Sequence, residues 1–144
     1  MESIKILITY WHKLADEKWK TTEGLMNLGR YADALFFCHL VIEAELKARV
    51  VIETGENAPF IHDLPRLAQL AVIVLSNEQN DELEEISTFN IEGRYDDYKF
   101  AFYKKATKHF AEKHFKLAYN LRLWIRKYTP PEKSGKKSKI TRAI

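Results

Sequence analysis

The sequence is short of the residues that interrupt helices, with five glycines and four prolines among 144 residues. It also lacks any stretch in which apolar and polar residues alternate for long enough to predict a β-strand. Its glycines stand apart from one another, which excludes a glycine-rich phosphate-binding loop. Together these shortages favour an all-α protein.

Other absences narrow the class of protein. A single cysteine, Cys38, excludes a disulfide within the chain, and no group of His, Cys and acidic residues has metal-ligand spacing. No run approaches the ~18 apolar residues of a membrane span, and residues 1–5 lack the features of a signal peptide. We therefore expect a cytoplasmic protein with no metal and no cofactor, and its 46% hydrophobic content is enough for a core.

Apolar residues at helical spacing predict two long helices in the first part of the chain. The first covers residues 4–28, and Gly29 supplies its stop. The second covers residues 31–53. Its broad apolar face predicts a central helix that is buried on more than one side.

The rest of the chain predicts further helices, about five in all. Asp63 and Pro65 are typical of a helix start, from which a short helix extends to about residue 75. Ser76 begins the next, with Gln79 in the position of a capping box. A long C-terminal helix is expected to extend to residue 128, followed by a disordered basic tail at residues 129–144. This tail either solubilises the chain or contacts nucleic acid or the ribosome.

Charge is unevenly distributed. Residues 1–98 carry nine basic and eighteen acidic residues, whereas residues 99–128 carry nine basic residues and one acidic residue, Glu112. On a continuous helix, the residues Tyr103, Ala106, Phe110, Leu117, Leu121, Trp124 and Tyr128 share one arc. The opposite face is a basic stripe of Lys104, Lys105, Lys108, Lys116, Arg122, Arg126 and Lys127. Because solvated faces usually mix charges, this stripe is either an ordinary outer face or a surface for an acidic partner or a phosphate backbone.

Five short motifs carry a family resemblance. They are Trp11-x3-Ala15-Asp16, Tyr31-Ala32-Asp33-Ala34-Leu35-Phe36, Glu43-x3-Lys47, His62-Asp63-Leu64 and Arg94-Tyr95-Asp96-Asp97. In this order and spacing, over about residues 8–128, they resemble the HEPN family. The likeness is to the bacterial and archaeal branch that is encoded beside minimal nucleotidyltransferases. One departure is Asp96, which replaces the proline that usually follows Arg-Tyr.

The resemblance implies an up-and-down helical bundle that usually dimerises. Many members bind nucleotides or RNA, and one branch consists of metal-independent ribonucleases with an Arg-x4-6-His motif. This sequence lacks that motif, because none of its five histidines has an arginine five to seven residues upstream. The most similar pair in this sequence is Lys104-x4-His109. A lysine does not form the two parallel hydrogen bonds that a guanidinium makes to a phosphate.

The leading hypothesis is a non-catalytic HEPN subunit that pairs with a minimal nucleotidyltransferase in a toxin–antitoxin-like or regulatory module. One alternative is a homodimer that binds RNA or a nucleotide through Arg94, Lys104, Lys105, Lys108 and Arg126. Another is a degenerate HEPN ribonuclease in which Lys104 and His109 act across a dimer. The charge distribution predicts a dimer in which each stripe meets the acidic surface of the other copy.

Two of the motifs also have local interpretations. Arg94 either orients a phosphate or forms an ion pair with Glu92, while Asp96 or Asp97 caps the last helix.

Glu43 and Lys47 are spaced as an ion pair on one face of a helix. His39 lies four residues before Glu43, so we expect a hydrogen bond between them, and we expect His62 to belong to the cap of the following helix.

Overall fold

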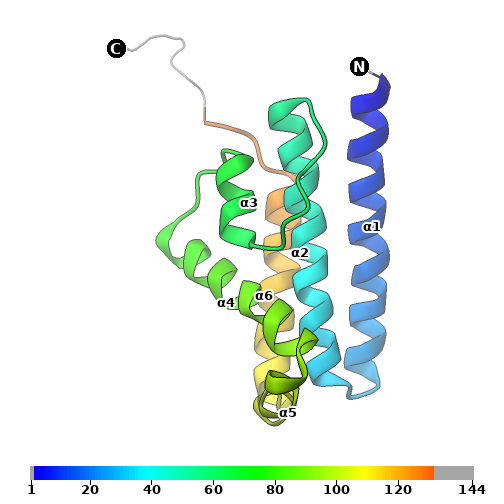
Figure 1. The fold of residues 1–144 in the computed structure, drawn as a ribbon, viewed down its shortest axis with the longest axis vertical. Helices are drawn as coiled ribbons and strands as arrows, with labels where there is room; N and C mark the ends of the chain where they lie inside the picture. The colour runs from blue at the N-terminus through cyan, green and yellow to red at the C-terminus, as the bar shows by residue number, and fades with distance from the viewer. Residues whose placement is uncertain (1, 132–144) are drawn as a thin grey trace.

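The computed structural model describes residues 2–131, and within this range it is all-α, with six helices and no strand (Figure 1). The helices are α1 (Glu2–Asn27), α2 (Tyr31–Thr54), α3 (Leu64–Leu70), α4 (Asn77–Arg94), α5 (Asp96–Lys105) and α6 (Lys108–Arg126). The predicted helical bundle is therefore confirmed. Residues 128–131 follow α6 without helical structure, and the rest of the predicted tail lies outside the described residues.

Helix α2 is the centre of the bundle. It packs against α1, α3, α4 and α6, and in Figure 1 these helices surround it. Its apolar residues are buried on several sides, as the breadth of its apolar face predicted. Leu35, Ile42 and Leu46 have no exposed surface. Any charged residue in the middle of α2 is therefore forced to find partners inside the protein.

The predicted helix termini at Gly29, Asp63 and Ser76 are confirmed. Gly29 has φ 74°, the left-handed conformation that ends α1 and that glycine adopts without steric cost. The Asp63 side chain accepts a hydrogen bond from the Arg66 backbone N–H at 3.2 Å. The Ser76 hydroxyl and the Gln79 side chain form a reciprocal capping box, each 3.0 Å from the other residue's backbone nitrogen.

The prediction of one continuous helix through residues 99–128 is wrong. The helix is interrupted at Ala106 and Thr107, and the Thr107 hydroxyl accepts a hydrogen bond from the Phe110 backbone N–H at 3.2 Å. This cap begins α6 in a new direction. As a result Phe102 enters the core with 1% of its surface exposed, whereas Tyr103, which was expected on the apolar arc, is 72% exposed.

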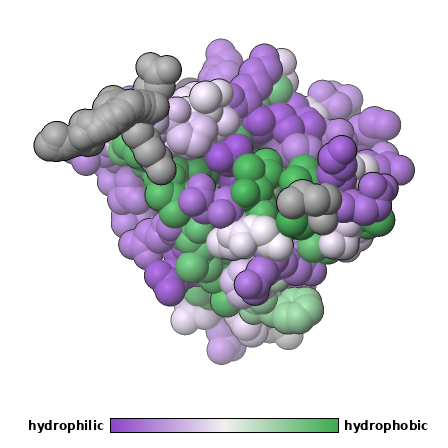
Figure 2. Space-filling model, turned by 90° about the horizontal axis from the view of Figure 1, so that it is seen from above, coloured by the Kyte–Doolittle hydropathy of each residue, from purple (hydrophilic) through white to green (hydrophobic). Residues whose placement is uncertain are grey.

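One end of the bundle carries exposed hydrophobic residues. Figure 2 views the molecule from above, the end at which α1 begins and α2 terminates, and shows hydrophobic residues across its middle with hydrophilic ones around them. Exposed hydrophobic side chains of these segments include Ile6 and Ile52, and Phe60 in the following loop is 99% exposed. Within residues 2–131, none of the helices has the length and hydropathy that crossing a membrane requires.

Candidate functional site

Helix α2 buries four charged side chains, Glu43, Glu45, Lys47 and Arg49, each less than one tenth exposed. Residues two apart on a helix lie ~200° apart. Glu43 and Lys47 therefore share one side of α2, and Glu45 and Arg49 share the other. Because a buried charge is costly unless it is paired, the partners of Glu43, Lys47 and Glu45 define two polar clusters, whereas Arg49 donates to the Tyr128 carbonyl at 3.4 Å.

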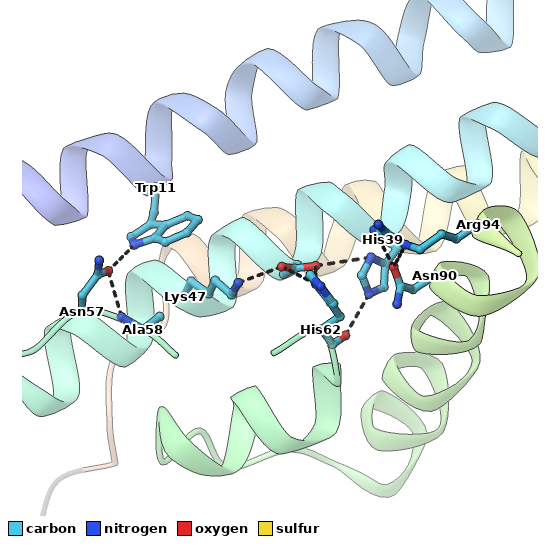
Figure 3. A network of polar contacts seen from close by, with 9 residues as sticks. Trp11, His39, Lys47, Asn57, Ala58, His62, Asn90 and Arg94 are labelled. Carbon is cyan, nitrogen blue, oxygen red and sulfur yellow. Dashed lines mark hydrogen bonds and ion pairs between the residues drawn. The ribbon is translucent and has the colours of Figure 1, made fainter. Parts of the chain in front are cut away.

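The first cluster is built around the Glu43 carboxylate, and its neighbours His39, Lys47 and His62 are labelled in Figure 3. Lys47 Nζ lies 2.8 Å from Glu43 Oε2, which confirms the predicted ion pair. His62 Nδ1 lies 3.2 Å from Oε1 and 3.1 Å from Oε2 of the same carboxylate. His62 was expected to belong to the cap of α3. This is wrong, because Asp63 forms the cap and the His62 side chain reaches back to α2.

His39 takes a different part in this cluster. Its ring is fully buried, and burial lowers its pKa below the ordinary value of 6.5. A neutral ring that donates from Nε2 to the His62 carbonyl at 2.9 Å has no proton left on Nδ1. This explains why Nδ1 lies 3.5 Å from Glu43 Oε1 and has no hydrogen-bond partner. The predicted hydrogen bond between His39 and Glu43 is therefore replaced by a longer contact.

The cluster also connects α1 to the loop that follows α2. Lys47 Nζ lies 5.2 Å from the centroid of the Trp11 ring, a cation–π distance. The Trp11 indole N–H donates to Asn57 Oδ1 at 3.0 Å, and the same oxygen accepts from the Ala58 backbone N–H at 2.9 Å. Motifs that lie far apart in the sequence thus hold α1, α2 and residues 55–63 together (Figure 3). The half-exposed His62 side chain also lines a cavity of about 350 Å³.

The second cluster is centred on Glu45. Arg126 donates from Nε and Nη2 to the two Glu45 oxygens at 2.7 Å each, and from Nη2 to Asp16 Oδ1 at 2.8 Å. Arg122 Nη2 lies 3.2 Å from the same Asp16 oxygen. Burial raises the pKa of Glu45, against the opposite effect of the Arg126 guanidinium. These two arginines of the basic stripe therefore point towards acidic residues of α1 and α2.

Arg94 does not form the predicted ion pair with Glu92. Its guanidinium donates to Asn90 Oδ1 at 3.2 and 3.0 Å and lies 5.4 Å from the centroid of the Phe36 ring. Glu92 instead lies 3.6 Å from Lys105 Nζ. The predicted aspartate cap is also wrong, because the N-cap of α5 is Tyr95, which makes no capping side-chain hydrogen bond.

The five predicted binding residues fall in two places. Arg94, Lys104, Lys105 and Lys108 lie between the last residue of α4 and the first turn of α6, and all four are exposed. Arg126 lies at the other end of α6 and is bound to Glu45 and Asp16. Their role in binding stays a prediction. The Lys104 and His109 pair of the ribonuclease hypothesis is divided between α5 and α6.

Aromatic residues of α5 were missed as candidate functional residues. Tyr98, Phe100 and Tyr103 are 53%, 69% and 72% exposed, and Lys104 Nζ lies 4.7 Å from the centroid of the Phe100 ring. The signal was present in the sequence, where residues 98–105 contain four aromatic residues and three lysines. Across residues 2–131, no three His, Cys, Asp or Glu side chains are grouped in a way that suits a metal ion.

A family model and a solved structure both match this chain. The family model of the HEPN domain matches residues 8–128. The crystal structure of TT1696 from Thermus thermophilus is similar with a TM-score of 0.70 and 20% sequence identity, over 82% of this chain and 94% of that chain. At this identity the likeness shows a shared fold. Among the curated proteins, none matches this chain significantly.

Proposed function

Because this chain belongs to the HEPN family, we propose that it is a non-catalytic HEPN subunit that pairs with a minimal nucleotidyltransferase in a toxin–antitoxin-like or regulatory module. The observation that carries the proposal is the lack of the Arg-x4-6-His motif anywhere in the sequence. The arrangement of Lys104 and His109 agrees with it, because they lie on different helices.

The buried clusters support a structural rather than a catalytic role for the family motifs. The carboxylates of Glu43 and Glu45 are bound to cations of the same chain, and Asp16 shares Arg126 with Glu45. These groups link α1, α2 and α6 to one another. A bundle fixed in this way presents a constant outer surface, which suits a subunit that works by binding a partner.

Co-expression with the product of the neighbouring gene tests the proposal. We expect a nucleotidyltransferase to co-purify with this chain in a complex of defined mass. Replacing Lys104, Lys105 and Lys108 with glutamate reverses the charge of these exposed side chains. The replacement should weaken the complex if the partner binds there. The matched control reverses Lys5, Lys13 and Lys20, which are exposed on α1. A neighbouring gene unrelated to nucleotide transfer, with no complex formed, would contradict the proposal.

A second candidate function is a homodimer that binds RNA or a nucleotide. The observation that favours it is the combination of exposed Lys104, Lys105 and Lys108 with the exposed aromatic rings of α5. Basic residues and aromatic rings together are typical of surfaces that bind single strands, because bases stack on the rings and phosphates pair with the cations. Such binding should weaken steeply as salt rises, because it displaces counterions from the phosphates.

A further inference from the structure

We propose that the cavity between α2, α4 and α5 is a docking site for an acidic segment of a protein partner. The segment inserts an apolar side chain among the aromatic rings of the cavity and places its carboxylates against the cations around them. The proposal rests on the proposed function, in which the chain works by binding a protein, and it names the surface and the chemistry of that partner. The cavity has a volume of about 430 Å³, within the ~300–1,000 Å³ that is usual for sites that enclose a ligand.

Aromatic side chains of α2 and α5 supply the apolar part of the cavity. Phe36, Phe100, Phe102 and Tyr103 contribute to its wall. Phe102 is 1% exposed, and its ring centroid lies 5.5 Å from that of Phe89, so Phe102 attaches α5 to the core. Phe100 and Tyr103 are 69% and 72% exposed, so packing within the chain does not account for them. Exposed apolar side chains that gather beside a cavity are typical of a surface that binds another molecule.

The position of Phe36 depends on the residue that faces it on α4. A Cβ added to Gly93 would lie 3.0 Å from Phe36 Cδ1 and 3.1 Å from Phe36 Cβ, which is closer than ordinary contact allows. Phe36 therefore lies directly against α4 because residue 93 has no side chain. The Arg94 guanidinium, which donates to Asn90, lies 5.4 Å from the centroid of the Phe36 ring. Gly93 and Arg94 thus define the wall of the cavity on the side of α4.

Two of the rings in this wall already have a cation over one face. Arg94 lies over Phe36, and Lys104 Nζ lies 4.7 Å from the centroid of the Phe100 ring. The covered face of each ring is closed to a stacked planar group. Contact with a ring leaves N–H groups of the cation that can donate to a carboxylate. An apolar side chain with carboxylates beside it therefore suits these pairs of ring and cation better than a stacked base does.

The charges around the cavity favour an acidic partner. Arg30 and Lys99 line the cavity, and Arg94 and Lys104 lie over rings of its wall. Among the described residues, Asp33 is the acidic residue that lines the cavity, so these four cations exceed it by three charges. Arg30 Nη2 lies 3.3 Å from Asp33 Oδ2, and both side chains are more than half exposed. Such a surface ion pair is weak, so a carboxylate of the partner can compete with Asp33 for the guanidinium.

An apolar cavity with cations around it has the arrangement of a protein interface. Such interfaces are centred on large side chains that fill pockets, and charged contacts surround them. Opposite charge on the partner then speeds association and selects against wrong partners. Surfaces that bind single strands instead combine a basic groove with open ring faces. The cavity therefore fits an acidic peptide segment with an apolar anchor.

Selection of phage-displayed random peptides on the native full chain tests the proposal. We expect the enriched peptides to carry two or more acidic residues beside an aromatic residue or a leucine. Fluorescence anisotropy of a labelled synthetic copy should show at least tenfold weaker binding to Phe100→Ala/Tyr103→Ala and to Arg30→Glu/Lys99→Glu. A copy with amides in place of its carboxylates should bind the native chain at least tenfold more weakly as well.

The matched controls are Tyr10→Ala/Phe60→Ala and Lys5→Glu/Lys13→Glu, which change exposed residues outside the cavity and should bind the peptide as the native chain does. Circular dichroism would show that each variant is folded. If the variant without the two rings does not fold, the charge-reversed variant still decides the matter.

Three results would overturn the docking site. They are a selection that enriches no acidic peptide, peptide binding that the cavity variants leave unchanged, and loss of single-stranded RNA binding in those variants when no peptide binds. A nucleotidyltransferase complex that forms equally well with the cavity variants would also overturn the site, but it would keep the proposed function. Peptide binding at the cavity without any such complex would support the site and overturn the proposed function alone.

Discussion

At the scale of single residues, Val72 has the least favourable backbone conformation of residues 2–131. Its φ is 54°, and it is the one residue other than glycine in this range with a positive φ. It follows α3 in the position that Gly29 occupies after α1, with the same pair of hydrogen bonds back to the helix. The left-handed conformation costs a residue with a Cβ about 1–2 kcal/mol, whereas glycine adopts it freely.

We therefore expect Val72→Gly to raise the free energy of unfolding by about 1 kcal/mol, after the greater entropy of glycine in the unfolded chain is subtracted. Val72 is 60% exposed, so the substitution removes little buried surface. Urea unfolding would measure the change. The control is Val74→Gly, at a similarly exposed residue without positive φ, which should not stabilise the protein. A loss of stability in Val72→Gly would contradict this account.

His39 makes the stability of the protein depend on pH. Burial lowers its pKa, and the pKa of His12 is lowered by burial and by Arg126. In the unfolded chain both rings titrate near pH 6.5. The stability that comes from keeping them neutral is therefore fully present above pH 6.5. It is lost as the pH falls from 6.5 towards the lowered pKa, because the unfolded chain then binds more protons.

We expect the free energy of unfolding to fall between pH 7.5 and pH 5.5, with each histidine contributing a slope of at most about 1.4 kcal/mol per pH unit. His39→Gln should reduce the slope, whatever its effect on stability at pH 7.5. Asn120→Gln, at an exposed residue of α6 that does not titrate, should leave the slope as it is. Urea unfolding at three pH values would test this, and equal slopes in the native protein and in His39→Gln would contradict it.

At the scale of elements, the quality of the sequence predictions followed the strength of the local signals. Helix ends marked by Gly29, Asp63 and Ser76 were predicted correctly, because each residue performs its hydrogen-bonding or conformational role locally. The interruption at Thr107 was missed. Apolar residues continue at helical spacing across it, and threonine is also compatible with a helix interior. Periodicity alone therefore gave one helix where the structure has two.

The interruption depends on the cap that begins α6. Thr107→Ala removes the hydrogen bond to the Phe110 N–H and should lower the free energy of unfolding by about 1 kcal/mol. Thr107→Asp keeps a capping oxygen and adds a favourable charge at a helix N-terminus, so it should stay within about 0.5 kcal/mol of the native protein. Thermal unfolding of both variants would test the prediction. Equal losses in the two would show that the cap is not what stabilises this terminus.

Helix α2 depends on the pairing of its buried charges. Glu43→Leu leaves Lys47 buried without its carboxylate, so we expect a loss of about 3 kcal/mol or more in the free energy of unfolding. Glu43→Leu combined with Lys47→Met removes both charges and should recover part of that loss. In the exposed pair of Glu17 and Lys20, Glu17→Leu should cost less than about 1 kcal/mol. A double variant no more stable than Glu43→Leu would contradict the explanation.

At the scale of the whole molecule, sequence reasoning predicted the helical class and the central place of α2, but not how the charges are paired. Glu45 and Arg126 are 81 residues apart, and their contact exists because α6 packs against α2. Helical spacing identified the stripe of basic residues without showing which of them face acidic residues. The cavity that lies between α2, α4 and α5 could not be predicted from the sequence either. Its wall combines Arg30, Phe36 and Gly93 with residues of α5, a helix whose separate existence was not predicted.

Exposed basic residues lie on α6 and exposed acidic residues lie on α4, and this separation bears on the homodimer, which stays a prediction. Arg122 and Arg126 are paired within the chain, whereas Lys113 and Lys116 are exposed on α6. Acidic residues gather in the first half of α4, where Asp81 and Glu84 are exposed. In a two-fold dimer, the surface that carries Lys113 and Lys116 on one copy can meet the surface that carries Asp81 and Glu84 on the other copy. Such contacts between exposed charges weaken as salt rises, because the Debye length falls from ~10 Å at 0.1 M to ~3 Å at 1 M.

We therefore expect sedimentation velocity to show a dimer at 50 mM salt and a larger fraction of monomer at 1 M salt. Lys113→Glu/Lys116→Glu should favour the monomer at low salt, and adding Asp81→Lys/Glu84→Lys to the same chain should restore the dimer. A dimer held instead by exposed hydrophobic side chains such as Phe60 would persist at 1 M salt, because burial of apolar surface is not screened. A monomer at both salt concentrations would exclude a two-fold interface of either kind, and the family's tendency to dimerise would then not extend to this chain.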